Sequence, residues 1–324
     1  MNKNSSILIK CTGGATAQLL ALSNAIYISN KTGRSFKIKY YPYSTGTYWK
    51  FAIGDLLTEK EIETEGVTKG INAEALESGE YIKNFPLRQK RISYARIHQA
   101  IHFLRLDSKL RKIRGEIVVA GKRKNLDKIN KKTNSVSGNF VPLIDKIVNK
   151  ELSRRFMSAN IPDPFDLNGV KREFVIHYRL GDMRKMPARN KEFGGHGVVD
   201  PITFKEILKL ESFDMDRMVV KVVSDEPTIA KQLLEDVGIK SEIDGSSSNL
   251  WKDLRVIGSA RVFIGSMSQF SLFGATITAT NQGRVYLPSS IYGEGKMSDV
   301  VGNSGFNYFD YLYLPKGHDV FSIS

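Results

Sequence analysis

The chain has very little cysteine and no long apolar run. Among its 324 residues Cys11 is the only cysteine, so an internal disulfide is excluded and a reducing cytoplasm is favoured. A small buried side chain is a more common role for such a residue than a nucleophile. No apolar run approaches the roughly 20 residues of a membrane-spanning helix. The apolar stretch near the N-terminus is too short for a secretory signal, and we expect a cytoplasmic globular protein.

The chain also lacks Gly-x-Gly-x-x-Gly, the phosphate-binding sequence of many dinucleotide-binding folds. In its place, a strand expected over 7–11 leads to Gly13 and Gly14, then to an Ala- and Leu-rich helix over 15–30 and a strand over 36–40. This is the order of a βαβ unit. The two glycines permit a tight turn, and the helix amides that follow can face an anion.

The length and the placement of proline predict two domains. Pro162 and Pro164 must end a helix expected over 142–156, so we predict an N-terminal domain over 1–160 and a C-terminal domain over 161–324. The polar middle, with short helices expected at 58–65 and 91–113, elaborates the first domain. The second half alternates strands expected at 173–177, 218–223, 241–243 and 262–265 with helices expected at 201–210, 226–237, 250–259 and 271–280.

Repeated strand–helix units of this kind predict an α/β fold of two Rossmann-like domains, each with a parallel sheet and helices on both faces. In the helix over 201–210, the side chains of Ile202, Ile207 and Leu208 are expected to face the core.

The nine residues from Phe174 to Asp182 form the most informative stretch of the chain. An apolar strand ends in His177, Arg179 and Asp182, so an imidazole, a guanidinium and a carboxylate follow its carboxyl end. Ligands bind at this end of the strands in open α/β sheets. The planar fork of Arg179 suits a diphosphate, and Gly181 allows the backbone to turn sharply. The alternative is an Arg–Asp pair that braces a loop.

The other strands of the second half also end in small or polar residues. Asp225 can accept hydrogen bonds from a ribose or a base, or it can cap the following helix. Serine hydroxyls and free amides at a helix start favour phosphate binding, with a plain helix start as the alternative. The residues expected to converge on one edge of the sheet are His177, Arg179, Ser224, Asp225, Asp244, Gly245, Gly265 and Ser266, with Ser268 and Ser271 just beyond.

Positive charge is concentrated in one part of the chain. The net charge is +14, and residues 88–132 contain 15 Lys and Arg against 3 acidic residues. Ile97, Ile101 and Leu104 recur there at roughly helical spacing, which predicts a helix with an apolar stripe and a basic remainder. Such a helix can contact anionic lipid, nucleic acid or an acidic glycan, or serve solubility alone. No nucleic-acid-binding signature accompanies the charge, so specific nucleic-acid recognition is not expected.

Four blocks of residues, taken in order, resemble the α-1,2-fucosyltransferase family and its wider GT-B fucosyltransferase relatives. That family shows Gly-Gly-Leu-Gly-Asn-Gln-Leu/Met-Phe, His-x-Arg-Arg-x-Asp, Ser-Asp-Asp and Asn-Ser-x-Phe-Ser-Trp-Trp-Gly-Ala. The corresponding blocks here are Gly13-Gly14-Ala15-Thr16-Ala17-Gln18-Leu19, His177-Tyr178-Arg179-Leu180-Gly181-Asp182, Ser224-Asp225, and Asp253-Leu254 leading to Ser266-Met267-Ser268-Gln269-Phe270-Ser271-Leu272-Phe273-Gly274-Ala275. The chain departs from the family at Ala17, Leu180 and Leu272-Phe273, near the presumed sugar-binding region.

The resemblance implies two facing Rossmann-like domains of the GT-B type, with the acceptor side in the first and the nucleotide sugar in the second. It implies an inverting, metal-independent glycosyltransferase without a cofactor or metal ligands, acting on GDP-fucose or a related sugar nucleotide. It also implies that Arg179 binds the diphosphate, Asp225 the nucleoside, and Ser268 and Ser271 the phosphates. The full predicted donor-binding set is Gly13, Gly14, Arg179, Ser224, Asp225, Ser266, Ser268 and Ser271.

Sugar transfer requires charge stabilisation and a proton acceptor. Arg179, helped by helix amides near Ser268, is expected to stabilise the departing diphosphate. The candidate bases are His177, Asp182 and His196, and Asp200 is a further acceptor-side candidate.

The expected acceptor is a bacterial surface glycan, such as lipopolysaccharide, or a lipid-linked oligosaccharide. The basic segment over 88–132 would then rest on the inner face of the cytoplasmic membrane. Two alternatives remain. One is an enzyme of the same fold that uses another donor, or that hydrolyses or epimerises a sugar nucleotide. The other is a non-catalytic protein that binds an anionic glycan, lipid or nucleic acid.

Overall fold

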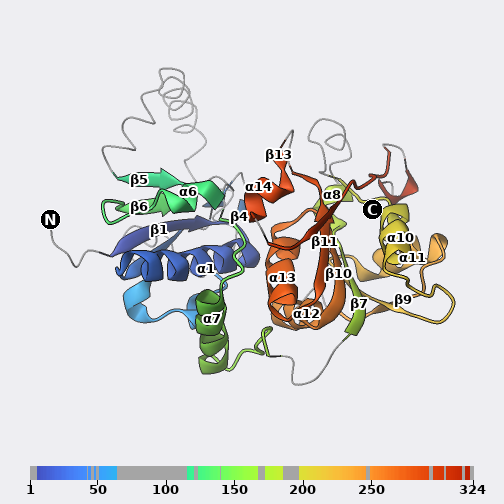
Figure 1. The fold of residues 1–324 in the computed structure, drawn as a ribbon, viewed down its shortest axis with the longest axis horizontal. Helices are drawn as coiled ribbons and strands as arrows, with labels where there is room; N and C mark the ends of the chain where they lie inside the picture. The colour runs from blue at the N-terminus through green and yellow to red at the C-terminus, as the bar shows by residue number, and fades with distance from the viewer. Residues whose placement is uncertain are drawn as a thin grey trace, which may run out of the picture. The chain divides into compact units, whose positions relative to one another are not determined.

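The computed structural model divides the chain into two compact units, Met1–Phe140 (unit 1) and Val141–Ser324 (unit 2) (Figure 1). Most of the basic segment, including the helix expected over 91–113, lies outside the described residues, as does His196. None of the described helices is both long and apolar enough to span a bilayer. The structure describes residues 6–41, 43–44, 47–48, 51–63, 115–119, 123–138, 140–166, 172–184, 197–245, 249–291, 295–302, 304–315 and 318–321.

Unit 1 is built around a parallel sheet with the strand order β2-β1-β6-β5. Alternate residues of β1 are buried, and α1 packs against β1 and β2. α1 is buried on nearly all sides and ends at Gly33, whose φ of 67° is a left-handed helix cap. The elements are β1 (Ile7–Thr12), α1 (Ala15–Thr32), β2 (Phe36–Tyr41), β3 (Tyr43–Ser44), β4 (Thr47–Tyr48), η1 (Gly54–Leu56), η2 (Glu59–Glu61), β5 (Glu116–Val118), α6 (Arg123–Asp127) and β6 (Ser135–Ser137).

Unit 2 contains a six-stranded parallel sheet in the order β14-β11-β10-β7-β8-β9. Read from β9, this is the 3-2-1-4-5-6 order of a doubly wound fold. Its elements are α7 (Lys146–Ser158), β7 (Arg172–Tyr178), α8 (Gly181–Arg184), α10 (Pro201–Leu210), β8 (Val220–Ser224), α11 (Pro227–Asp236), β9 (Ser241–Ile243), α12 (Leu250–Gly258), β10 (Ala260–Gly265), α13 (Gln269–Thr280), β11 (Arg284–Pro288), β12 (Ser290–Ile291), β13 (Gly295–Lys296), α14 (Met297–Val301), β14 (Asn307–Phe309) and η3 (Asp319–Phe321).

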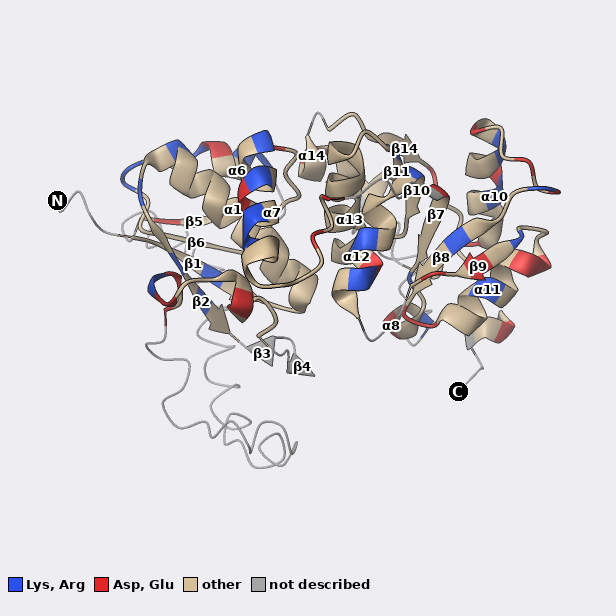
Figure 2. Ribbon diagram, turned by 90° about the horizontal axis from the view of Figure 1, so that it is seen from below, with Lys and Arg blue, Asp and Glu red and all other residues tan. Residues whose placement is uncertain are grey.

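Helices cover both faces of the unit 2 sheet. Phe174, Ile176 and Tyr178 of β7 join one apolar core together with residues of α10 and α11. α12 and α13 contact β7 and β10 and lie on the other side of the sheet (Figures 1 and 2). Successive β7 side chains therefore point alternately into two different helix layers, which is why this strand is apolar along its length. The predicted α/β class, with parallel sheets, is confirmed.

The boundary between the compact units falls after Phe140, whereas the two prolines suggested residue 160. The helix in question, α7, packs on unit 2. Its Asn149 Nδ2 donates to Thr280 Oγ1 at 2.7 Å, and the ring of Phe156 lies 5.4 Å from that of Trp251. Pro162 thus follows an element that already belongs to the second unit.

Two local expectations differ from the structure. Ile202 was expected to face the core but is 39% exposed, whereas Phe204, Ile207 and Leu208 are fully buried. The apolar stripe of α10 is narrower than the run of apolar letters suggests. At 58–65 the described residues form only a single 3-10 turn, η2, held by a capping box between Thr58 and Glu61.

Candidate functional site

The ends of β7 and β10 form the switch point of the unit 2 sheet. The chain leaves β7 toward β8 on one side, and β10 pairs with β7 on the other. In the register, His177 lies opposite Gly265 of β10 and opposite Val223 of β8. The strand ends that were expected to converge therefore do so at neighbouring positions. Ligands of open α/β sheets bind outside the carboxyl ends of the strands at such a point.

Ser266 joins the two central strands just beyond their last paired residues. Its buried hydroxyl donates to the carbonyl of His177 at 2.7 Å and accepts the backbone N–H of Arg179 at 3.1 Å. One hydroxyl thus fixes the backbone on either side of Tyr178. The predicted site residue Ser266 therefore positions Arg179, while its own hydroxyl is already engaged.

His177 is buried, with 3% of its surface exposed. Its Nδ1 lies 2.6 Å from Ser271 Oγ, and its ring packs 4.8 Å from the ring of Phe270. Burial, and secondarily the positive charge of Arg179, lower the pKa of His177 to about 3. The imidazole is therefore neutral at physiological pH and is a weak proton acceptor.

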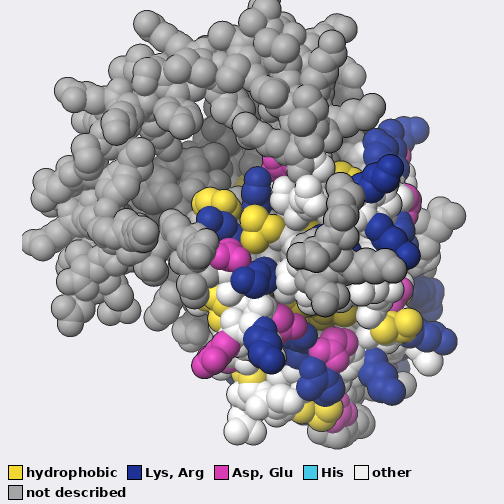
Figure 3. Space-filling model, turned by 90° about the vertical axis from the view of Figure 1, so that its left-hand side faces the viewer, with side chains coloured by type: hydrophobic (Ala, Val, Ile, Leu, Met, Phe, Trp, Pro, Cys, Tyr) yellow, Lys and Arg dark blue, Asp and Glu magenta, His cyan; other side chains and the backbone are white. Residues whose placement is uncertain are grey.

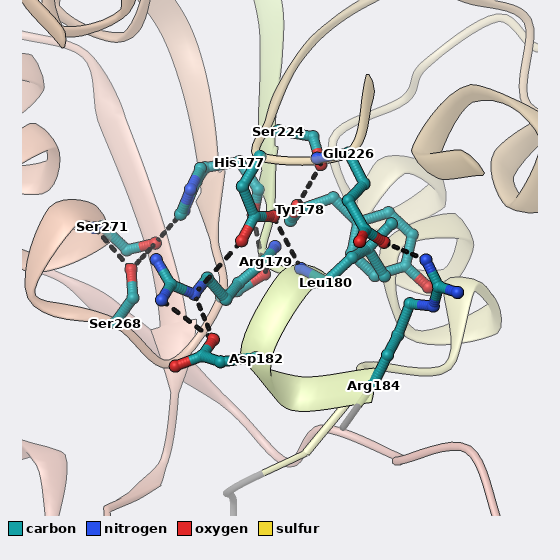
Figure 4. Close-up of polar contacts among 12 residues, drawn as sticks. His177, Tyr178, Arg179, Leu180, Asp182, Arg184, Ser224, Glu226, Ser268 and Ser271 are labelled. Carbon is teal, nitrogen blue, oxygen red and sulfur yellow. Dashed lines mark hydrogen bonds and ion pairs between the residues drawn. The ribbon is translucent and has the colours of Figure 1, made fainter. Parts of the chain in front are cut away.

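Arg179 leaves the end of β7 with a partly exposed guanidinium. Its Nε donates to Asp182 Oδ1 at 2.9 Å, and its Nη2 lies 2.8 Å from the same oxygen. Its Nε is also 3.5 Å from Asp225 Oδ2. Figure 4 shows the guanidinium joined to the Asp182 carboxylate. The Arg–Asp pair, which the sequence offered as the alternative to a diphosphate-binding role for Arg179, is therefore present in the structure. It lies at the position where a ligand is expected.

Asp225 turns back over the start of α8. Its Oδ1 accepts the backbone N–H of Leu180 at 2.9 Å, and α11 begins instead after Glu226, so helix capping is not the role of this carboxylate. A Cβ on Gly181 would lie 2.5 Å from Asp225 Oδ2. Gly181 was expected to allow a sharp turn, but its φ is not in the left-handed region. What the position requires is space for Asp225.

A second layer of contacts holds the turn that carries Asp225. Ser224 Oγ donates to the carbonyl of Tyr178 at 2.7 Å and accepts the N–H of Glu226 at 3.0 Å. The buried Arg184 forms an ion pair with Glu226 and donates to the carbonyl of Val320 at 2.8 Å (Figure 4). Arg184 and Glu226 were not among the predicted site residues. Their only signal in the sequence was proximity, since Glu226 directly follows Asp225 and Arg184 follows Asp182 by two residues.

The start of α13 supplies the serine cluster. Ser268 is the N-cap, and its hydroxyl accepts the N–H of Ser271 at 3.0 Å and donates to Ser271 Oγ at 3.3 Å. The first N–H groups of a helix have no acceptor within it, so they can face an anion. Ser271 is fully buried and bonded to His177, which leaves Ser268 as the more accessible hydroxyl.

The departures from the fucosyltransferase pattern lie in apolar cores. Leu180, Leu272 and Phe273 are 0%, 6% and 1% exposed, and Ala17 of unit 1 is 7% exposed. Leu180 belongs to the same core as Phe174 and Ile176. These side chains therefore pack inside their units and do not line an exposed surface. A sequence position beside a site residue does not by itself place a side chain in the site.

Gly13 and Gly14 follow β1 in unit 1. Gly13 has φ of 101°, which a residue with a Cβ rarely adopts, and its carbonyl accepts from Gln18 Nε2 at 3.0 Å and Tyr40 Oη at 3.3 Å. Gly14 is the N-cap of α1 and carries no capping side chain. The turn is thus fixed through the Gly13 carbonyl.

Asp200 and the acidic residues that follow β9 in the chain lie away from Arg179 in sequence, and Asp200 has a structural role. Asp200 is the N-cap of α10, where its Oδ1 accepts the N–H of Ile202 at 3.0 Å. Asp244 and Gly245 follow β9, and a Cβ on Gly245 would lie 3.1 Å from Asp253 Oδ1. Asp253 is thus buried at the carboxyl edge of the sheet.

The described residues hold no group of three or more His, Cys, Asp or Glu that could bind a metal ion. The Asp-x-Asp sequence Asp214-Met215-Asp216 lies in the turn before β8, at the opposite edge of the sheet from Arg179. There Asp214 Oδ1 accepts the N–H groups of Asp216 and Arg217 at 3.0 and 3.2 Å.

Comparison with known proteins gives fold likenesses only. No family model and no curated protein matches the chain. Among solved structures it is similar to POFUT1 in its apo form, with 11% identity, a TM-score of 0.38 and coverage of 89% of this chain and 98% of the other. It is also similar to NodZ alpha-1,6-fucosyltransferase soaked with GDP-fucose, with 11% identity, a TM-score of 0.38 and coverage of 84% and 93%.

A third similar structure is the heptosyltransferase WaaC of E. coli with ADP-2-deoxy-2-fluoro heptose. The identity is 13%, the TM-score 0.36, and the coverage 92% of this chain and 97% of the other. These likenesses are weak, and the geometry at the end of β7 is the stronger guide to function.

Proposed function

We propose that the protein is a glycosyltransferase that moves a sugar from a nucleoside diphosphate to a hydroxyl of a glycan. The observation that carries the proposal is the position of Arg179. It is a partly exposed guanidinium at the switch point of a doubly wound sheet, with the N-terminus of α13 starting from the neighbouring strand. A guanidinium fork binds phosphate through two parallel N–H groups, and a helix N-terminus offers free amides to an anion.

In the transfer, the bond between the anomeric carbon and the diphosphate oxygen breaks, and the diphosphate leaves with the electron pair. Arg179 would stabilise that charge from one strand end, and the α13 amides beside Ser268 from the next. Removal of one such preorganised donor typically lowers the rate about 10²- to 10³-fold. No cofactor or metal forms part of the proposed reaction.

The acceptor hydroxyl must lose a proton as it attacks the anomeric carbon. His177 is a poor candidate, because its ring is buried, bonded to Ser271 and lowered in pKa to about 3. Asp182 has a side chain that is 48% exposed, close to Arg179. We therefore propose that the Asp182 carboxylate accepts the proton. His177 would hold Ser271 and the start of α13 in place.

GDP-fucose is the donor we propose, on the resemblance of the four residue blocks. Asp225 would lie toward the nucleoside and Ser268 toward the phosphates, whereas the buried hydroxyls of Ser224, Ser266 and Ser271 are engaged within unit 2 and would position the groups around them. A thermal-shift screen against GDP, UDP, CDP and CMP tests this choice. GDP is expected to raise the melting temperature more than the other nucleotides do. A larger rise with UDP or CDP would show that the donor is not GDP-fucose.

Replacement of the guanidinium is the direct test of the site. Arg179→Ala is expected to lower sugar transfer by about 10²-fold or more while leaving the unfolding free energy nearly unchanged, since the lost ion pair is partly exposed. Release of GDP from GDP-fucose in the presence of glycan acceptors provides the readout. Arg217→Ala is the matched control, because Arg217 is 88% exposed in the turn before β8. Near-normal turnover by Arg179→Ala would remove the assignment.

We further propose that the acceptor is a lipid-linked or surface glycan of a bacterium, and that the protein meets it at the inner face of the cytoplasmic membrane. In the described part of the basic segment, Lys124, Lys128, Lys131 and Lys132 are exposed. Figure 3 shows Lys and Arg side chains spread over the described part of one face, with Asp and Glu between them. Each basic residue near an anionic bilayer contributes about 1 kcal/mol to binding.

Flotation with liposomes that contain anionic lipid tests the membrane proposal. Binding is expected to weaken as salt rises and to fall when Lys124, Lys128, Lys131 and Lys132 are replaced by Gln. Binding that is unchanged by all four replacements would exclude this surface. Salt-sensitive liposome binding without stabilisation by any nucleotide would instead favour a non-catalytic lipid- or glycan-binding protein.

A further inference from the structure

The charges around Arg179 do not suit an anion as they stand. One guanidinium faces two carboxylates, Asp182 at 2.8 and 2.9 Å and Asp225 at 3.5 Å. The local sum is one negative charge. An incoming diphosphate would therefore meet repulsion unless one carboxylate leaves the guanidinium.

The two carboxylates are held very differently. Asp225 is fixed, since its Oδ1 accepts the Leu180 N–H at 2.9 Å and its Oδ2 lies against Gly181. The side chain of Asp182 is 48% exposed, and within the described residues its hydrogen-bond partner is Arg179 alone. Asp182 is thus the carboxylate that can move at little cost.

Asp182 also occupies the part of Arg179 that a phosphate would use. Its Oδ1 takes both Nε and Nη2, which form one donor edge of the guanidinium fork. Carboxylates and phosphates bind that edge in the same way. The ligand and Asp182 are therefore alternative partners of a single set of N–H groups.

We propose that Asp182 is an exchangeable counter-ion: it holds Arg179 in place in the free protein and is displaced when the diphosphate of the donor binds. The proposal rests on the proposed function, because it assumes a diphosphate ligand. Exchange also frees the Asp182 carboxylate from the guanidinium at the moment the donor arrives. Donor binding would then precede proton acceptance, which gives an ordered reaction.

Removal of the competing charge should strengthen anion binding. Asp182→Asn keeps the shape of the side chain and is expected to bind inorganic pyrophosphate and GDP about 2- to 5-fold more tightly at low ionic strength, a range set by the small energies of exposed ion pairs. Catalytic turnover is expected to fall in the same variant, because the variant lacks the carboxylate to which we assign the proton. A merely structural role for Asp182 would not raise affinity.

The experiment is isothermal titration calorimetry of pyrophosphate and GDP into the full-length wild-type chain and four variants, Asp182→Asn, Arg179→Ala, the double variant, and Asp216→Asn. Asp216 is exposed in the turn at the opposite sheet edge, so its variant controls for the change in net charge. In the double variant the gain from Asp182→Asn should vanish, since both partners compete for Arg179.

The outcomes separate the inference from the proposed function. If the wild-type chain binds GDP through Arg179 but Asp182→Asn binds equally or less tightly, the exchange is wrong and the glycosyltransferase proposal stands. An equal gain for Asp216→Asn would reduce the effect to net charge and also overturn the exchange. If neither ligand binds the wild-type chain, or binding survives Arg179→Ala, both proposals fail.

Discussion

At the carboxyl edge of each sheet a parallel strand leads through a turn into a helix, but the side chains at the two edges differ in charge. In unit 1, β1 passes through Gly13 and Gly14 into α1, and the turn is held by neutral side chains. In unit 2, the ends of β7 and β10 carry His177, Arg179 and the serines of α13. One edge thus offers backbone amides, and the other adds fixed charge.

The comparison shows how one fold divides its work. An edge built from glycine depends on backbone geometry, so it should be sensitive to added side-chain volume and insensitive to pH. An edge built from buried and charged side chains should respond to protonation. The following changes test this difference.

The largest expected effect is the pH dependence that His177 gives to unit 2. Its pKa is about 6.5 when unfolded and about 3 when folded, so between these values the unfolded chain binds the extra proton. Stability therefore falls as the pH drops below 6.5, by about 1.4 kcal/mol per unit for one proton. From pH 6.5 to 4.5 the loss from His177 is about 2–3 kcal/mol.

A single-tryptophan variant makes this measurable. The chain has two tryptophans, so Trp49→Phe leaves Trp251, which packs on Phe156 in unit 2, as the reporter. The unfolding free energy, measured by urea and tryptophan fluorescence across this pH range, is compared between this protein and its His177→Gln variant. Glutamine does not titrate. The variant is expected to lose most of the dependence assigned to His177. An unchanged slope would mean that the imidazole is not buried in its neutral form.

The second effect concerns the space above Gly181. In Gly181→Ala the new Cβ would lie 2.5 Å from Asp225 Oδ2, so the carboxylate must turn away from the Leu180 N–H. Loss of such a charge-assisted bond costs about 1.5–3 kcal/mol. Urea unfolding of Gly181→Ala, Asp225→Ala and the double variant measures it. The two losses should not add, because Asp225→Ala already removes the clash; simple additivity would contradict the contact.

The smallest effect belongs to unit 1. Gly13→Ala places a Cβ at a φ of 101° and 3.1 Å from the Cβ of Ala17, which is expected to cost about 1–2 kcal/mol. Gly14→Ala is the matched control, because its φ of −66° suits any residue. Unfolding followed by circular dichroism gives both values. Equal losses at the two positions would show that backbone geometry is not what Gly13 provides.

Much of the unit 2 fold is predictable from the sequence because its strands are apolar and its helices follow at regular spacing. α10 and β9 begin and end where the pattern places them. β5 and β6 of unit 1 were not predicted, because each has only three residues and, unlike β9, neither stands in the regular strand–helix alternation that marks the sequence of unit 2. The boundary between the units falls before α7 and not after it, because proline marks where a helix ends but not which unit the helix packs on.

For the site, the sequence identifies which strand ends matter but not what each side chain does there. Arg179 and Asp225 lie side by side because parallel neighbours end at one edge. The burial of His177 depends on α13, which arrives nearly a hundred residues later, and nothing near His177 in the sequence reports it. Leu180 is the clearest case, since it sits between two site residues and yet packs in the core.

The central position of β7 has a consequence for synthesis of the chain. β7 is the first strand of unit 2 to be synthesised, and its neighbour β10 follows only after β8 and β9 in the chain. Until Ala260–Gly265 emerges, the partner strand that brings Ser266 is missing, and the peptide around Arg179 lacks the hydroxyl that fixes it. Domains generally fold as units during synthesis. A nascent chain that stops at α12 would therefore carry every residue of the His-x-Arg-x-Gly-Asp stretch and still have no assembled site.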